Sequence, residues 1–144
     1  MVNRQTPSLS FEVFPPNPAV GNDKIFQALR EMQDLAPHFI SVTASNNKFD
    51  IEETTVRLTE FIANDLKIPT IAHLPAVYLT KDMVSNILQS LDRVGVHQIL
   101  ALRGDIFPDV APKDDFTYAT DLIEYIKTEA PHFDIIGACY PEGH

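Results

Sequence analysis

The sequence predicts an α/β fold with a parallel sheet, because strand-like and helix-like segments alternate along the chain. Several strand-like segments are apolar without alternation, which is typical of parallel strands covered by helices, so we expect most strands to be buried on both faces. The segments start about every 30 residues, a spacing that suits β-loop-α-loop units joined by right-handed crossovers. All five are rich in β-branched or aromatic residues and bounded by turn residues: Leu9–Phe14, Phe39–Thr43, Thr70–Leu74, Gln98–Leu102 and Phe133–Cys139.

The intervening segments have the apolar periodicity of amphipathic helices. Asn22 or Asp23 can cap the first helix, Thr80 can cap the third, and Gly95 stands where a left-handed C-terminal residue is expected. The fourth helix is predicted to begin near Asp115, with Tyr118 in its first turn. The apolar positions of the four helices are Ile25, Leu29, Met32 and Leu35; Ile51, Leu58, Phe61 and Ile62; Val84, Ile87, Leu88, Leu91 and Val94; and Ala119, Leu122, Ile123 and Ile126.

The length of 144 residues fits one domain. Eight β/α units would need about 240 residues, close to the roughly 250 of a (β/α)8 barrel, and this chain holds about four and a half units. The residues by themselves therefore leave two architectures open, a smaller open sheet and a part of a barrel.

The composition is that of a folded, acidic, soluble protein, with 44% hydrophobic residues and a mean hydropathy of -0.07. The 11 Lys and Arg against 20 Asp and Glu give a net charge of -9, which disfavours nucleic acid and anionic membranes as partners. The single cysteine, Cys139, cannot form an internal disulfide, and residues 1–10 lack the apolar core of a signal peptide. We therefore expect a cytoplasmic protein with no nucleic-acid or membrane partner.

Polar residues lie in or directly after every predicted strand, toward the end where parallel α/β folds build their sites. Every strand thus contributes at least one group that can form a hydrogen bond or titrate. In strand order they are Glu12; Thr43; His73; Arg103-Gly104-Asp105; and Tyr140-Pro141-Glu142-Gly143-His144. The pattern predicts a site assembled at one end of the sheet.

Glu12 is the most informative of these residues, because it interrupts an apolar strand and a carboxylate is costly to bury unless it is paired or protonated. It is either a general acid or a residue that faces solvent or pairs with Arg103. His73 is either a satisfied core histidine or a ligand-binding one. Arg103 can meet an anionic group such as a phosphate, with Gly104 allowing close backbone approach, and Asp105 is either functional or a loop cap.

Several common sites are excluded by inspection. The five glycines do not stand in dinucleotide-binding or P-loop spacing, and no nucleophile elbow surrounds a serine. Glu12, His73, Glu142 and His144 could in principle bind a metal, but their spacing matches no recognised ligand pattern. We therefore predict no metal site.

The whole chain resembles the methylenetetrahydrofolate reductase family. The resemblance rests on six motifs in that family's order and spacing: Ser10-Phe11-Glu12-Val13-Phe14-Pro15-Pro16, Phe39-Ile40-Ser41-Val42-Thr43, Ala72-His73-Leu74, Ile99-Leu100-Ala101-Leu102-Arg103-Gly104-Asp105, Tyr118-Ala119-Thr120-Asp121-Leu122 and Tyr140-Pro141-Glu142-Gly143-His144. It implies that residues 1–144 are the N-terminal part of one FAD-binding (β/α)8 TIM-barrel domain, truncated after the first four and a half β/α units.

The resemblance also implies an activity and a set of site residues. The reaction would be the reduction of 5,10-methylenetetrahydrofolate to 5-methyltetrahydrofolate for methionine synthesis, with FAD as cofactor and NADH or NADPH as hydride donor. Glu12 matches the general acid, and Asp105 matches the acidic residue beside the flavin and the pterin. Contacts to FAD are implied for Thr43, His73, Leu102, Arg103, Gly104, Asp105, Tyr118, Ala119, Tyr140 and His144.

Two segments depart from the family pattern. Ala44-Ser45-Asn46-Asn47-Lys48 replaces an aromatic residue and a glycine-rich turn, and Pro75-Ala76 replaces Thr-Cys.

The expected exposed edges of the first and last strands favour association, including a homo-oligomer. The alternatives to an enzyme are a catalytically incomplete half-barrel, alone or paired with another chain, with at most weak flavin binding, and an unrelated α/β binding protein.

Overall fold

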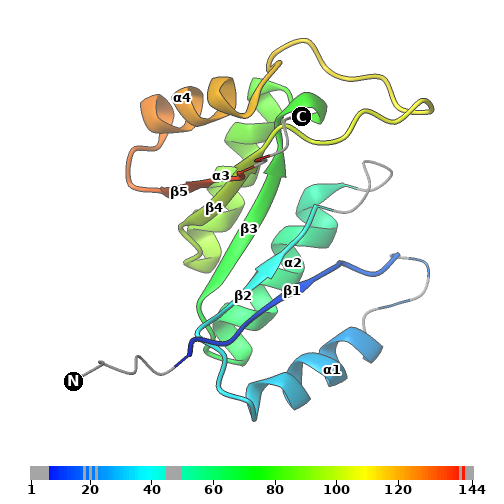
Figure 1. Cartoon of the computed structure of the whole chain (residues 1–144), viewed down its shortest axis with the longest axis vertical. Helices are drawn as coiled ribbons and strands as arrows, with labels where there is room; N and C mark the ends of the chain where they lie inside the picture. The colour runs from blue at the N-terminus through cyan, green and yellow to red at the C-terminus, as the bar shows by residue number, and fades with distance from the viewer. Residues whose placement is uncertain are drawn as a thin grey trace.

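Five parallel strands form one sheet in the computed structural model, which describes residues 7–17, 19, 21, 23–44, 50–139 and 141. Each strand pairs in parallel with the next, so the spatial order is the chain order (Figure 1). All five predicted strands are confirmed, and the largest difference is that the last one ends at Gly137 rather than Cys139. The strands are β1 Ser10–Val13, β2 Phe39–Val42, β3 Thr70–Pro75, β4 Gln98–Leu102 and β5 Asp134–Gly137.

Helices connect the strands as the periodicity predicts. Thr80 caps the third helix by accepting a hydrogen bond from the Met83 backbone N–H at 3.2 Å. Gly95 ends this helix in the left-handed conformation, with φ of 76°. The helices are α1 Asp23–Gln33; a continuous run made of the π-helical Glu52–Val56, α2 Arg57–Glu60 and the π-helical Phe61–Asp65; the 3-10 turn Ala76–Tyr78; α3 Lys81–Val94; and α4 Ala119–Glu129.

The prediction that the fourth helix begins near Asp115 is wrong. The Asp115 carboxylate instead accepts a hydrogen bond from the backbone N–H of Lys81 at 2.8 Å, so it caps the start of α3. The helix α4 begins four residues later, where the Asp121 carboxylate accepts from the backbone N–H groups of Thr117 and Tyr118. Tyr118 therefore precedes α4 and is not part of its first turn.

Two details of the first helix also differ from expectation. Leu35 was placed on its apolar face, but α1 ends at Gln33 and the Leu35 side chain is exposed. Asp23 is the first residue of α1, and Asn22, the other candidate cap, lies outside the described residues. The other predicted apolar positions of this helix are buried or half-buried.

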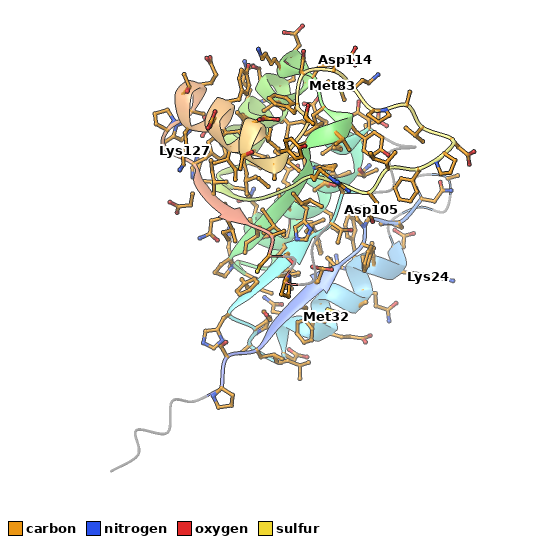
Figure 2. All side chains as sticks on the ribbon, turned by 45° about the horizontal axis from the view of Figure 1, so that its top comes forward. Lys24, Met32, Met83, Asp105, Asp114 and Lys127 are labelled. Atoms are coloured by element: carbon orange, nitrogen blue, oxygen red, sulfur yellow. The ribbon has the colours of Figure 1, made fainter. Side chains whose placement is uncertain are left out.

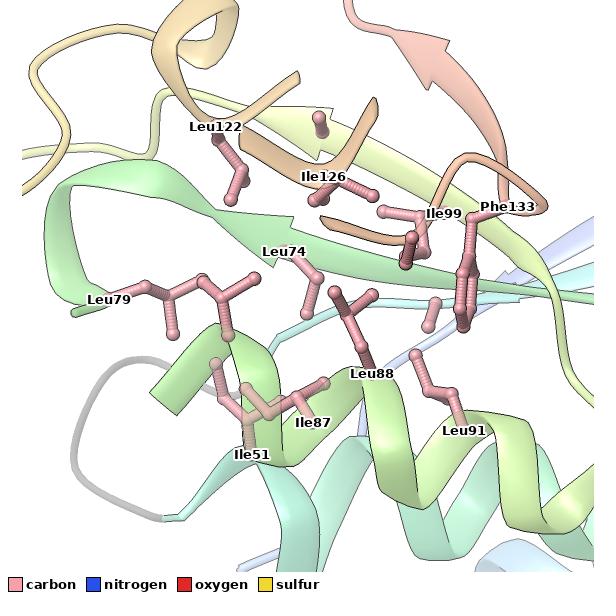
Figure 3. Close-up of a cluster of buried hydrophobic side chains, with 14 of the residues drawn as sticks. Ile51, Leu74, Leu79, Ile87, Leu88, Leu91, Ile99, Leu122, Ile126 and Phe133 are labelled. Atoms are coloured by element: carbon pink, nitrogen blue, oxygen red, sulfur yellow. The ribbon is translucent and has the colours of Figure 1, made fainter. Parts of the chain in front are cut away.

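All helices pack against one face of the sheet, because right-handed crossovers between sequential neighbouring strands place every helix on the same side. Two hydrophobic clusters fill this interface. One joins β1 and β2 to α1 and α2, through residues that include Leu29, Ile40, Val42 and Ile62. The other joins β3 and β4 to α3 and α4 (Figure 3), through residues that include Leu74, Leu91, Ile99, Leu122 and Ile126.

The opposite face of the sheet is less covered. Leu100 and Leu102 are half-buried there, and Ile136 is 40% exposed. Of the five strands only β3 is buried at every position, so the prediction that most strands are buried on both faces is wrong. The reason is that helices cover one face only, and β1 and β5 each have a single neighbour.

Sequential strand order with one helical layer is the architecture of a (β/α)8 barrel, in which the uncovered face becomes the interior. The chain therefore forms a partial TIM-type barrel of five strands. Among the described residues, no helix has the length and apolar character needed to cross a lipid bilayer.

Candidate functional site

A cavity of about 370 Å³ lies at the carboxyl ends of the strands, on the face that the helices leave uncovered. Six residues predicted from the sequence line it: Glu12, Thr43, His73, Leu102, Gly104 and Asp105. Its remaining lining residues are mostly apolar: Phe14, Ala44, Pro75, Leu100, Phe107 and Ala138. A larger groove of about 680 Å³ lies between α1, α2 and α3, and none of the predicted site residues lines it. We therefore assign the candidate site to the smaller cavity.

Glu12 and His73 reach this cavity from β1 and β3. Glu12 pairs with Ser41, and Ser41 pairs with Ile71. His73 comes two residues after Ile71 on β3, so its side chain lies on the same face of the sheet as that of Glu12. The Glu12 Oε2 lies 3.8 Å from the His73 Nε2, within ion-pair range but too long for a hydrogen bond. The Glu12 side chain is 55% exposed. The sequence argument that a carboxylate in an apolar strand is costly to bury therefore does not apply to it.

Two buried polar atoms in the cavity have no hydrogen-bond partner among the described residues. They are the Thr43 Oγ1 and the His73 Nε2. Burial lowers the pKa of His73, and the opposing effect of the Glu12 carboxylate is smaller, so the imidazole is neutral at pH 7. Because a buried polar group without a partner costs about 1–3 kcal/mol, these two atoms indicate a place for a polar ligand.

The turn Arg103-Gly104-Asp105 closes one side of the cavity. Gly104 has φ of 90°, and a Cβ at this position would lie 3.0 Å from the Pro75 Cβ and 3.2 Å from the Val77 Cγ2. Glycine is therefore required here by the left-handed backbone and by contact with β3, whereas the sequence suggested close approach to a ligand. Asp105 lies on this turn where β4 has ended (Figure 2).

Tyr78 holds this turn in place and was missed in the sequence. Its buried hydroxyl donates to the Asp105 carbonyl at 2.7 Å and accepts from the Phe107 backbone N–H at 3.0 Å. The backbone N–H of Val77 also donates to the Arg103 carbonyl at 3.0 Å. A signal did exist, because a tyrosine within a buried apolar run needs a partner for its hydroxyl.

The remaining predicted residues lie outside this cavity. Arg103 and Tyr118 line a second cavity of about 310 Å³, together with Lys113. Ala119 is the half-buried first residue of α4, directly after Tyr118. Because Arg103 and Gly104 are consecutive, the two cavities flank the same turn. Tyr140 and His144 lie outside the described residues.

Comparison with known proteins identifies relatives along the full chain. A family model described as "Methylenetetrahydrofolate reductase" matches residues 1–144. The chain is 36% identical over 138 residues to the 5,10-methylenetetrahydrofolate reductase of Buchnera aphidicola, covering 95% of the chain and 45% of that protein.

Two further relatives have similar identity. The 5,10-methylenetetrahydrofolate reductase of Escherichia coli is 31% identical, with 95% of the chain and 45% of that protein covered. Methylenetetrahydrofolate reductase 2 of Schizosaccharomyces pombe is 32% identical, with 94% of the chain and 22% of that protein covered. The chain thus spans less than half the length of these relatives. It belongs to the methylenetetrahydrofolate reductase family.

Proposed function

We propose that this chain supplies the folate-protonating and flavin-binding half of an enzyme that reduces 5,10-methylenetetrahydrofolate to 5-methyltetrahydrofolate, which serves methionine synthesis in the cytoplasm. The cofactor would be FAD, and the hydride donor NADH or NADPH. One observation carries the proposal: Glu12, Thr43, His73 and Asp105 converge on one cavity at the carboxyl ends of the strands. Family membership supports the reaction class.

The cavity residues fit a flavin. Thr43 and His73 offer buried hydrogen-bonding atoms that lack partners among the described residues, which suits the carbonyl oxygens and ring nitrogens of an isoalloxazine. Leu100, Leu102 and Phe107 supply apolar surface for a planar ring. The second cavity is lined by two cationic residues, Arg103 and Lys113, and one acidic residue, Asp114, so its lining carries a net positive charge suited to phosphates.

Glu12 can carry the acid chemistry of this reaction. A proton delivered from its carboxyl group to a folate ring nitrogen would open the five-membered ring and leave an electron-poor carbon that accepts hydride. The exposure of Glu12 on the uncovered face leaves its carboxyl group accessible to a substrate. The chemistry that a bound FAD would supply, once NADH or NADPH had reduced it, is donation of a hydride to that carbon. Asp105 would lie beside both rings and position them through its charge.

The test is the change Glu12→Gln in a protein that contains this chain together with the rest of the barrel. We expect folate reduction to fall by about 10²–10⁴-fold, the contribution of a general acid, while reduction of the flavin by NADH or NADPH persists. Glu53→Gln, an exposed residue on the helical side, is the matched control. Equal loss of both half-reactions in Glu12→Gln would contradict the assignment.

Asp105→Asn tests the second acidic residue in the same protein. We expect weaker folate binding and altered flavin reactivity, because a negative charge beside both rings is removed. Stopped-flow measurement of each half-reaction separates the two effects. Unchanged kinetics in both half-reactions would make Asp105 a structural residue of the turn.

The exposed apolar side chains on the uncovered face favour a second candidate for the isolated chain, a catalytically incomplete half-barrel. Phe14 and Ile136 are both exposed there. The absorbance spectrum of the purified chain after addition of FAD and desalting distinguishes the two. Retained stoichiometric flavin supports a complete binding site, and a folded sample without flavin supports the half-barrel.

A further inference from the structure

A cluster of two imidazoles and one carboxylate lies at the amino-terminal end of the sheet, opposite the cavity. Asp92 is in the last turn of α3, His97 directly precedes β4, and His132 precedes β5. The Nε2 atoms of His97 and His132 lie 2.8 Å and 2.9 Å from the same Asp92 Oδ1. The His132 Nε2 also lies 3.1 Å from Oδ2. Three potential ligand atoms therefore converge, all within 4.8 Å of one another.

The local fold holds Asp92 and His97 together. Gly95 adopts a left-handed conformation, its N–H donates to the Asp92 carbonyl, and the Val96 N–H donates to the Leu91 carbonyl. These two bonds form a Schellman turn, which reverses the chain and returns His97 to the side of Asp92. The cluster thus depends on a well-defined backbone turn and not on a long loop.

The second imidazole is positioned from the neighbouring β/α unit. The Asp134 N–H donates to the His97 carbonyl at 2.8 Å, which ties the start of β5 to the start of β4. Phe133 is buried, and its ring centroid lies 5.4 Å from that of His97 and 4.7 Å from that of His132. The two imidazoles are therefore packed against a fixed aromatic ring.

We propose that Asp92, His97 and His132 form a binding site for a divalent transition-metal ion, with Zn²⁺ as the best match. Two nitrogen ligands and one carboxylate oxygen, with a water as fourth ligand, are a common tetrahedral zinc set. Ligand atoms in such a site lie about 3.3 Å apart, given bond lengths of about 2.0–2.2 Å, so the observed spacing needs only small side-chain movements.

The accessibility and chemistry of the three side chains agree with this site. Each side chain is about half exposed, so an ion and its remaining water ligand can reach it. To bind the ion, each imidazole must present an unprotonated Nε2. A proton on the Nε2 of a neutral ring moves to Nδ1, a charged ring releases its Nε2 proton to solvent, and no electrons are transferred. The metal would join the α3–β4 turn to the α4–β5 turn and so act as a clamp between two neighbouring β/α units.

The test uses the purified protein after treatment with EDTA, titrated with Zn²⁺ by calorimetry and with Co²⁺ by visible absorbance. We expect one ion per chain, a tetrahedral Co²⁺ spectrum, and a rise in Tm of about 5 °C or more at Zn²⁺ concentrations well above Kd. His97→Ala and His132→Ala should each weaken binding by at least about tenfold. Loss of a residue that only hydrogen-bonds to a metal ligand already lowers metal affinity by that much, and these two residues are proposed as ligands themselves.

Two control variants make the outcome decisive. His38→Ala removes an exposed histidine outside the cluster, and Cys139→Ser removes the exposed thiol. Both should bind Zn²⁺ as the unchanged protein does, and far-UV circular dichroism should show that all four variants are folded. The proposal is overturned if no ion binds, if binding is unchanged in both cluster variants, or if a control variant loses binding as the cluster variants do.

Discussion

The polar side chains at the two ends of the sheet differ in burial and in hydrogen bonding. At the carboxyl end, Thr43 and His73 are buried, and their side-chain atoms in the cavity have no hydrogen-bond partner among the described residues. At the amino end, Asp92, His97 and His132 are half exposed, and both imidazoles pair with the Asp92 carboxylate. Buried atoms without partners cost stability unless a ligand completes them, whereas exposed pairs contribute little either way. The difference supports the proposal that a polar ligand binds at the carboxyl end.

The largest expected effect comes from Gly104→Ala at the carboxyl end. The left-handed backbone costs about 1–2 kcal/mol for a residue with a Cβ, and the contact with Pro75 adds about 1–3 kcal/mol of overpacking. We therefore expect a loss of about 2–5 kcal/mol in the free energy of unfolding, measured by urea denaturation.

Gly95→Ala at the amino end is the matched control. Gly95 has φ of 76°, but nothing lies within 4 Å of the position its Cβ would take. Only the backbone cost of about 1–2 kcal/mol should remain. Equal losses in the two variants would show that the contact between Gly104 and Pro75 does not constrain the turn.

The next prediction compares two variants whose stability should change in opposite directions. Thr43→Val removes a buried hydroxyl that has no partner among the described residues, so we expect a gain of about 1 kcal/mol in stability and weaker flavin binding. Thr55→Val removes a buried hydroxyl that donates to the Thr43 carbonyl at 3.0 Å, so we expect a loss of about 1 kcal/mol. Thermal melts of both variants measure this. A loss in Thr43→Val would mean that its hydroxyl is already satisfied.

Much of the fold could be predicted from the sequence, because apolar periodicity and cap residues report local structure directly. Thr80 and Gly95 mark both ends of α3 correctly. Asp115 misled the prediction of α4, since an aspartate can cap a helix that is distant in sequence, and here it caps α3. Burial was overestimated, because a strand's amino acids do not reveal whether a second layer covers its other face.

The residues of the candidate site that lie at or near strand ends could be predicted from the sequence. Glu12, Thr43 and His73 lie on one face of the sheet. Glu12 is in register with Ser41 and Ile71, and Thr43 and His73 each come two residues later on their own chain segments. Tyr78 was missed because its two hydrogen bonds join segments that are 27 and 29 residues apart. The cluster of Asp92, His97 and His132 was missed for the same reason, since His132 stands 40 residues from Asp92.

A smaller effect is the pH dependence that His73 introduces. Its pKa in the folded chain is lowered by burial, so the unfolded chain binds a proton more readily, and stability falls as the pH drops below the ordinary value of 6.5. His73→Leu should therefore stabilise the chain more at pH 5 than at pH 8, as measured by urea denaturation. The control for the loss of an imidazole is His38→Leu, at an exposed position outside the cavity. A gain independent of pH would contradict the lowered pKa.

The smallest effect is expected at the amino end in the absence of metal. With EDTA present, His97→Ala breaks one half-exposed contact with Asp92 and leaves the Schellman turn intact, because that turn is made by backbone atoms. Exposed ion pairs contribute about 1 kcal/mol or less, so Tm should fall by no more than about 2–4 °C. A much larger fall would mean that His97 supports the fold through its packing on Phe133, and the amino end would then resemble the carboxyl end in depending on a buried contact.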